Sequence, residues 1–154
     1  MLFRSVLSIQ ITGEAREVGR IFGSIVRDIR DNSLPFAPPA ALIAGGETAV
    51  TVRGKGKGGR NQELALAAAV KISGSYGVIV GSFATDGIEG RTNAAGAVAD
   101  GSTITRGLRL RMDPEEFLRN NDSYRFFSKL KDLVMTGPTG TNVNDIAIFA
   151  ADRR

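Results

Sequence analysis

The stretch that decides the fold is Gly45 to Glu63, GGETAVTVRGKGKGGRNQE. A strand-like run, Thr48 to Val52, enters a loop of alternating glycines and cations, and an Ala/Leu-rich helix follows. The cations of this loop are Arg53, Lys55, Lys57 and Arg60. Glycine lets backbone N–H groups approach a ligand, and a helix N-terminus adds unpaired donors and a positive dipole end. Because neighbouring cations repel one another, the stretch predicts an anion site, most simply for phosphate; the alternative is a flexible basic turn without a ligand.

Composition limits the chemistry that the chain can perform. Its 154 residues are 42% hydrophobic and 23% charged, which is typical of one globular domain, and the formal net charge of +4 does not by itself indicate nucleic acid. The absence of cysteine and histidine excludes disulfides, thiol chemistry, Ser-His-Asp triads and the usual zinc sites. Catalysis would depend on carboxylates, Lys, Arg, hydroxyls, backbone N–H groups or a hard metal with oxygen ligands.

Neither a membrane nor a nucleic acid is an expected partner. No apolar run reaches the ~20 residues of a membrane span, and the opening MLFRSVLSIQI lacks the apolar block and cleavage site of a signal peptide. We therefore expect a cytoplasmic protein. No aromatic residue lies between Phe36 and Tyr76, so the basic loop has no nearby platform on which bases could stack.

Helical and strand-like segments alternate along the chain. This pattern predicts an α/β, layered fold with a mixed, mainly parallel sheet flanked by helices. Helices are expected over 13–30, 61–73 and 102–111, from 113, and from 122 or 123 to about 130, with a short helix or turn over 94–99. Strands are expected over 1–11, 40–44, 48–53, 76–84, 133–136 and 146–150, the second and third as hairpin partners. Residues 1–39 are interpreted as an N-terminal helix and linker that enter a domain at 40–154.

The glycine loop matches two phosphate-binding motifs only in part. Gly54, Gly56 and Gly59 satisfy G-x-G-x-x-G, but the next acidic residue, Asp86, lies beyond the ~20-residue spacing of a dinucleotide fingerprint. A P-loop would carry Lys and then Ser or Thr where this chain has Arg60-Asn61. The loop is therefore neither motif.

Two further loops, 85–93 and 136–145, follow predicted strands, where α/β folds commonly bind ligands. Asp86 could hold Mg²⁺ or accept a proton from a hydroxyl, or it could simply form an Asp-Gly turn. The loop TGPTGTNVND could cradle phosphate or sugar hydroxyls, or its side chains could satisfy their own backbone. Together the three loops could support phosphoryl transfer, which needs neither His nor Cys.

Four motifs in order resemble one known family. GGETAVTVRGKGKGGRNQELALAAA, TDGIEGRTNAAGAVADG (85–101), NNDSYRFF (120–127) and TGPTGTNVNDI (136–146) closely resemble the C-terminal MOFRL domain of the two-domain glycerate kinases, some of which are labelled hydroxypyruvate reductases. The match covers about residues 40–150. It implies ATP- and Mg²⁺-dependent phosphorylation of D-glycerate to 2-phosphoglycerate, in a cleft between this domain and an N-terminal Rossmann-like domain.

The resemblance also implies site residues. The catalytic candidates are Arg60, as a forked clamp on phosphate or carboxylate, Asp86, as a contact for metal or the substrate hydroxyl, and Lys55. Glu47 and Gln62 also match motif positions. The expected substrate- and phosphate-binding residues are Gly58, Gly59, Asn61, Glu63, Thr139, Gly140, Thr141, Asn142 and Asp145.

Two departures from the family limit what the resemblance implies. Arg91 and Asn93 stand where the family usually has Pro and Asp, which weakens a metal role for that loop. The N-terminal domain and its lysine have no counterpart, so we expect little activity from the chain alone. The expected partner is a separate N-terminal glycerate kinase domain or another copy of the chain. The alternatives are a non-enzymatic phosphate- or nucleotide-binding module and a hydroxypyruvate reductase, with nucleic-acid binding ranked last.

Overall fold

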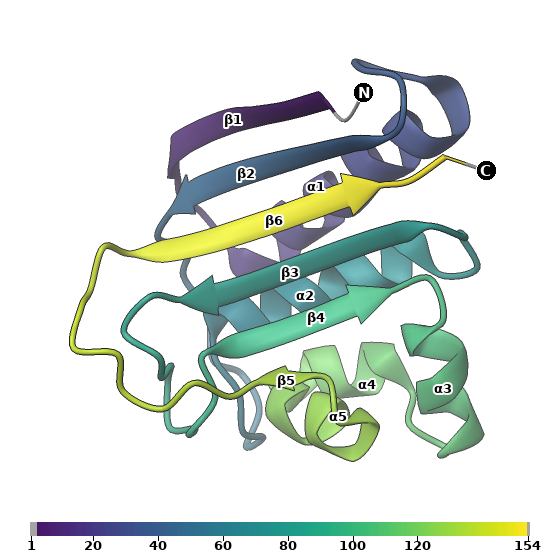
Figure 1. Ribbon diagram of the computed structural model, residues 1–154. Helices are drawn as coiled ribbons and strands as arrows, with labels where there is room; N and C mark the ends of the chain where they lie inside the picture. The colour runs from purple at the N-terminus through teal and green to yellow at the C-terminus, as the bar shows by residue number, and fades with distance from the viewer. Residues whose placement is uncertain (1–2, 154) are drawn as a thin grey trace.

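The computed structural model describes residues 3–153, and its strands form one open six-stranded sheet in the order β1-β2-β6-β3-β4-β5 (Figure 1). The strands are β1 (Phe3–Ile11), β2 (Ala40–Gly46), β3 (Val78–Ala84), β4 (Gly96–Asp100), β5 (Leu133–Val134) and β6 (Asp145–Ala151). The helices are α1 (Ala15–Asn32), α2 (Arg60–Ile72), α3 (Thr103–Arg109), α4 (Pro114–Arg119) and α5 (Ser123–Leu130). The predicted α/β class and mixed sheet are confirmed.

The prediction of a mainly parallel sheet is wrong. Only β1 and β2 pair in parallel among the described strands, and every other neighbouring pair is antiparallel. The physical reason lies in the connections, because a parallel crossover needs a dozen or more residues and usually a helix. The short loop between β3 and β4 contains no helix, so β4 can only turn back beside β3.

Two predicted elements differ in the structure. Residues 94–99 were expected to form a short helix or turn, but Gly96–Asp100 forms β4, whose pairing with β3 overrides the helix propensity of its alanines. Residues 48–53 form no strand; Ala49 makes only an isolated bridge to Glu14. β2 cannot accept a hairpin partner there because β1 and β6 already occupy both of its edges.

The remaining expected helices and strands are confirmed, although β5 is shorter than predicted. Residues 1, 2 and 154 of the expected lead-in and C-terminus lie outside the described range. Residues 33–39 carry no helix or strand, and Phe36 of this segment stacks on Phe3 of β1 with ring centroids 3.8 Å apart. No helix in the described part of the chain is long and apolar enough to cross a membrane.

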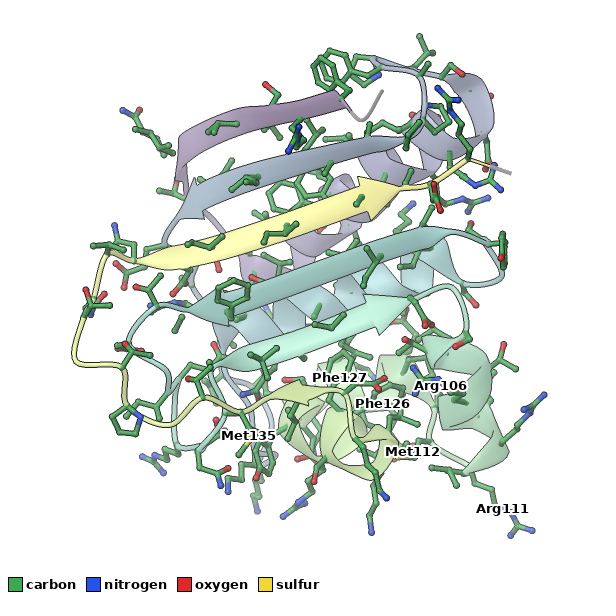
Figure 2. All side chains as sticks on the ribbon, in the orientation of Figure 1. Arg106, Arg111, Met112, Phe126, Phe127 and Met135 are labelled. Carbon is green, nitrogen blue, oxygen red and sulfur yellow. The ribbon has the colours of Figure 1, made fainter. Side chains whose placement is uncertain are left out.

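Helix α2 is the centre of the core, as its nearly continuous apolar sequence predicts. On one side, Leu64 and Ile72 pack with α1 and the middle of the sheet, where Phe22 stacks on Phe149. On its other side, α2 packs with β4 and with the short helices α3 to α5. Of these helices, α5 contributes the buried Phe126 and Phe127 (Figure 2). Because α2 is fixed on both sides, its N-terminus has one defined position in the fold.

Candidate active site

A cleft of about 1100 Å³ lies at the end of the sheet where β2 and β3 terminate (left in Figure 1). One wall is the stretch 47–60, which connects β2 to α2, and the other is the loop 86–91 after β3. The third predicted loop is bonded to the second: the Thr139 N–H donates to the Asp86 carbonyl at 3.0 Å, and the Val143 N–H donates to Thr85 Oγ1 at 2.8 Å. The fold therefore gathers all three loops at one end of the sheet.

Arg60, the first residue of α2, points its guanidinium between two carboxylates. Its Nη2 donates to Asp145 Oδ1 at 3.1 Å, Nε donates to the other oxygen of Asp145, and Nη1 lies 3.0 Å from Glu47 Oε1. The hydrogen bonds that Arg60 donates to Asp145, a buried residue at the start of β6, raise the pKa of Arg60. The cation is thus held at the cleft with about a third of its side chain exposed.

Glu89 occupies the N-terminus of α2. Its carboxylate accepts hydrogen bonds from the N–H groups of Asn61 at 2.7 Å and Gln62 at 2.8 Å. Burial raises the pKa of Glu89 to about 7, the helix N–H bonds oppose this rise, and the charge of Asp145 adds to it. A Cβ on Gly59 would lie 2.6 Å from the carboxyl carbon, so this close approach requires glycine. An internal carboxylate therefore takes the helix donors that the sequence assigned to a ligand.

Glu89 is not among the site residues expected from the sequence. The available signal was its place in TDGIEG, after a buried strand and close to a loop that precedes a helix. Its pairing with residues almost thirty positions earlier is a tertiary feature that the local sequence does not reveal.

Asn61 and Glu63, both expected to bind ligand, are about 1% exposed and bonded within the protein. The Asn61 amide donates to Glu89 at 3.0 Å and its oxygen accepts from Ser82 Oγ at 2.6 Å. The Glu63 carboxylate accepts hydrogen bonds from Arg16 Nε at 2.8 Å and from the Asn121 side-chain amide at 3.0 Å. These contacts fix the start of α2, while contact of either side chain with a ligand stays a prediction.

The glycine loop is hydrogen-bonded to the turn Asn120–Asp122. The N–H groups of Arg53 and Gly54 donate to Asn121 Oδ1 at 2.8 and 3.0 Å. Those of Lys55, Gly56 and Lys57 donate to oxygens of residues 120 and 122 at 2.7 to 3.0 Å. Gly54 and Gly56 therefore allow two backbones to touch, and the amides of 53–57 are not free for phosphate.

Two backbone donors of this loop remain available. Within residues 3–153, the N–H groups of Gly58 and Gly59 have no protein acceptor, and both residues line the cleft beside Arg60. The Lys57 ammonium lies 4.3 Å from the centre of the Tyr124 ring, whereas Lys55 is exposed at the cleft. Lys55 is therefore the lysine that is better placed to meet an anion.

Asp86 lines the same cleft, and its Oδ1 accepts the Ile88 N–H at 3.2 Å, which is the turn contact considered as the alternative reading. The described residues contain no cluster of three acidic side chains that could hold a metal alone. Mg²⁺, however, is often held by one or two carboxylates together with substrate phosphates, and a lone Asp86 fits that mode.

Thr139, Gly140, Thr141 and Asn142 lie outside the cleft lining and are exposed. The Thr139 hydroxyl donates to the Thr85 carbonyl, and the Asn142 side chain accepts the Asn144 N–H at 3.1 Å. These side chains satisfy their own backbone, as in the second reading of this loop, and their contact with a ligand stays a prediction.

The fold and the cleft define an α/β domain in which one wall of the cleft carries Lys55, Lys57 and Arg60. Residues 40–145 match the MOFRL family, and the chain belongs to that family, which confirms the resemblance. It is 50% identical over 143 residues to D-glycerate 2-kinase from Thermotoga maritima and 46% identical over 144 residues to glycerate 2-kinase from Pyrococcus horikoshii. These alignments cover 93% of this chain but only 34% and 32% of the relatives.

Solved structures show the same relation. A crystal structure of glycerate kinase from Thermotoga maritima superposes with a TM-score of 0.94 at 48% identity, covering 96% of this chain and 36% of that one. A protein named putative hydroxypyruvate reductase from Agrobacterium vitis is 43% identical over 143 residues, which are 37% of its length. The chain thus spans about a third of the relatives that it matches.

Proposed function

We propose that this chain supplies one wall of a glycerate kinase active site, in which ATP and Mg²⁺ phosphorylate D-glycerate to 2-phosphoglycerate. The observation that carries the proposal is the placement of Arg60 by Asp145 and Glu47 in a cleft with Lys55 and two unpaired amides. Phosphoryl transfer is accelerated mainly by positioning and by positive charge around the transferring group, and these residues provide both.

Each residue has a role that follows from its position. Arg60 binds the substrate carboxylate or the transferring phosphoryl group through the edge of its fork that faces the cleft. Lys55 and the N–H groups of Gly58 and Gly59 offset the remaining negative charge. Asp86 would hold the substrate hydroxyl or Mg²⁺, and a bound Mg²⁺ would offset negative charge on the phosphates. Glu89 accepts hydrogen bonds from the first turn of α2 and in this way holds the loop 86–91 against α2.

A second body of protein completes the site. About two thirds of the relatives' length lies outside the residues that align with this chain. We infer that the missing part supplies the remaining phosphate and nucleotide contacts. The chain alone would then bind anions weakly and turn over little or no glycerate.

The structure gives little support to the alternative oxidoreductase. A dinucleotide fingerprint needs its glycines and the helix N-terminus for the pyrophosphate. Here Gly54 and Gly56 pack on the turn at 120–122, and Glu89 fills the N-terminus of α2. A non-enzymatic anion-binding module remains the second candidate, favoured by the same cationic wall.

One assay separates these functions. Phosphorylation of D-glycerate by Mg·ATP is measured with this chain alone and with an added N-terminal segment of the Thermotoga maritima relative, and NADH oxidation by hydroxypyruvate serves as the parallel reaction. Turnover only in the mixture supports the proposal. Turnover by the chain alone refutes the need for a second body, NADH oxidation favours the reductase, and phosphate binding without turnover favours the binding module.

A further inference from the structure

One face of the sheet is covered by α1 and α2, and no helix of residues 3–153 lies over the other face (Figure 1). Residues that alternate with the core positions of β2, β6 and β3 point to this open face. Strand register aligns them in rows across the sheet. The rows are Ala41–Ala150–Ile79, Ile43–Ile148–Gly81–Val98 and Gly45–Ile146–Phe83. Ile43, Ile79 and Ile148 are 42%, 43% and 38% exposed, so the face is apolar and uncovered.

We propose that this open face packs against the same face of a second copy of the chain, about a two-fold axis that runs along β6. Stacked sheets lie ~10 Å apart and keep their strands roughly aligned, which such an axis permits. The axis keeps each row opposite itself and places β2 of one copy over β3 of the other, since both strands adjoin β6. The contact is isologous, so each pairing occurs twice.

Side-chain sizes across the face are complementary under this operation. Ile43 lies over the partner's Gly81, Ile79 lies over the partner's Ala41, and Phe83 lies over the partner's Gly45. Large side chains thus face small ones on both sides of the axis, as close packing of two sheets requires.

The other two-fold orientation lacks this complementarity. An axis across the strands would place β3 over β3 and exchange the outer rows. Ile79 would then meet the partner's Phe83, and Ala41 would meet the partner's Gly45. Bulky side chains would collide on one strand and leave a gap on another, so the axis along β6 is favoured.

Charges at the ends of one row agree with the same axis. Arg4 of β1 pairs with Ala41, and Asp100 of β4 pairs with Ile79, so opposite charges terminate the first row on opposite edges. The axis along β6 brings Arg4 over the partner's Asp100. The surface therefore has an apolar centre and a complementary polar rim, the usual anatomy of a protein–protein interface.

Cross-linking tests the axis directly, because the chain has no cysteine. Ile148→Cys places one thiol on the axis, and Leu108→Cys, on α3 and 55% exposed, is the matched control. Sheets ~10 Å apart are too far for a direct disulfide, so a short bis-maleimide is used. We expect dimers from Ile148→Cys at a rate at least about tenfold above the control, since the bound partner raises the local thiol concentration. Equal rates would overturn the proposal.

Sedimentation of the unmodified full chain gives the second measurement. We expect a dimer that Ile148→Lys and Arg4→Glu weaken at least about tenfold in Kd, whereas Leu108→Lys and Arg4→Lys leave the Kd within about threefold. A chain that stays monomeric at all concentrations refutes the proposal and would indicate that a different polypeptide covers the face. A dimer insensitive to both interface variants refutes it as well. If Ile148→Lys does not fold, Arg4→Glu, on an exposed residue, decides the question.

Discussion

Replacing Glu89 by Gln should change how the stability of the protein depends on pH. Its carboxyl is 6% exposed, and burial raises its pKa from 4.5 to about 7. Between these two values the folded protein holds a proton that the unfolded chain has released, so this group lowers the free energy of unfolding as pH rises. At ~1.4 kcal/mol per pKa unit, the loss is complete above pH 7 and amounts to about 3 kcal/mol.

Urea unfolding of the wild type and Glu89→Gln at about pH 4.5, 6 and 8 measures this effect. The free energy of unfolding of the variant, relative to the wild type, should rise by up to about 3 kcal/mol over that range. The bond from the Thr51 N–H lowers the pKa of Glu14 and acts in the opposite sense, but it is common to both proteins. Glu116→Gln, exposed on α4, is the control. If the free energy of unfolding depends on pH in the same way for the wild type and Glu89→Gln, the placement of a buried carboxyl at the N-terminus of α2 is refuted.

Three further variants test the packing and the site. Gly56→Ala should lower the free energy of unfolding by about 1–3 kcal/mol, because its Cβ would lie 2.5 Å from the Asn120 carbonyl oxygen. Lys55→Ala in the same loop should lower it by less than about 0.5 kcal/mol. Equal losses for the two variants in urea unfolding would contradict the close packing of the loop on residues 120–122. Phe149→Ala should cost about 3–5 kcal/mol by the same method, since it removes a buried ring that stacks 4.6 Å from Phe22. Arg60→Lys should lower kcat/KM for D-glycerate in the assembled enzyme about a hundredfold, because an ammonium cannot bind Asp145 through a fork and also reach the substrate; unchanged turnover would remove Arg60 from the site.

Elements with strong local periodicity were predictable from the sequence. The apolar stripe of α1, from Ala15 to Ile29, and the Val- and Ile-rich run of β3 identify their own type, because burial of one face decides both. The helix of small residues that became α2 was predictable for the same reason. These segments do not encode strand direction. Direction depends on the connections between strands and on β6, the last strand in the sequence, which lies in the centre of the sheet between β2 and β3.

Strand β4 shows where local reasoning fails. Its sequence, Gly96–Asp100, is short and rich in small residues, so neither propensity nor periodicity distinguishes a turn of helix from a strand. Pairing with β3 and packing against α2 decide the outcome, and both are contacts distant in sequence. The strand expected at 48–53 did not form beside β2, because β1 and β6 already occupy both edges of β2.

The sequence indicated several residues that line the cleft, but not the hydrogen bonds that hold its loops in place. Lys55, Arg60 and Asp86 do line one cleft, as motif order and strand ends suggested. The partners of the loop amides and of α2 could not be foreseen, because Asn121 and Glu89 reach them across long stretches of chain. A glycine-rich loop before a helix therefore indicated the place of the cleft, but not which backbone donors of the loop are free.

The most direct test of the central proposal is D-glycerate phosphorylation by a chimera in which this chain replaces the matching third of the Thermotoga maritima relative. The folded chimera should convert D-glycerate and Mg·ATP to 2-phosphoglycerate, and Arg60→Ala in the chimera should lower kcat/KM at least about a hundredfold while the cooperative melting transition is kept. A chimera that melts cooperatively but has no kinase activity, or one whose activity survives Arg60→Ala, would contradict the assignment of this cleft as a glycerate kinase wall.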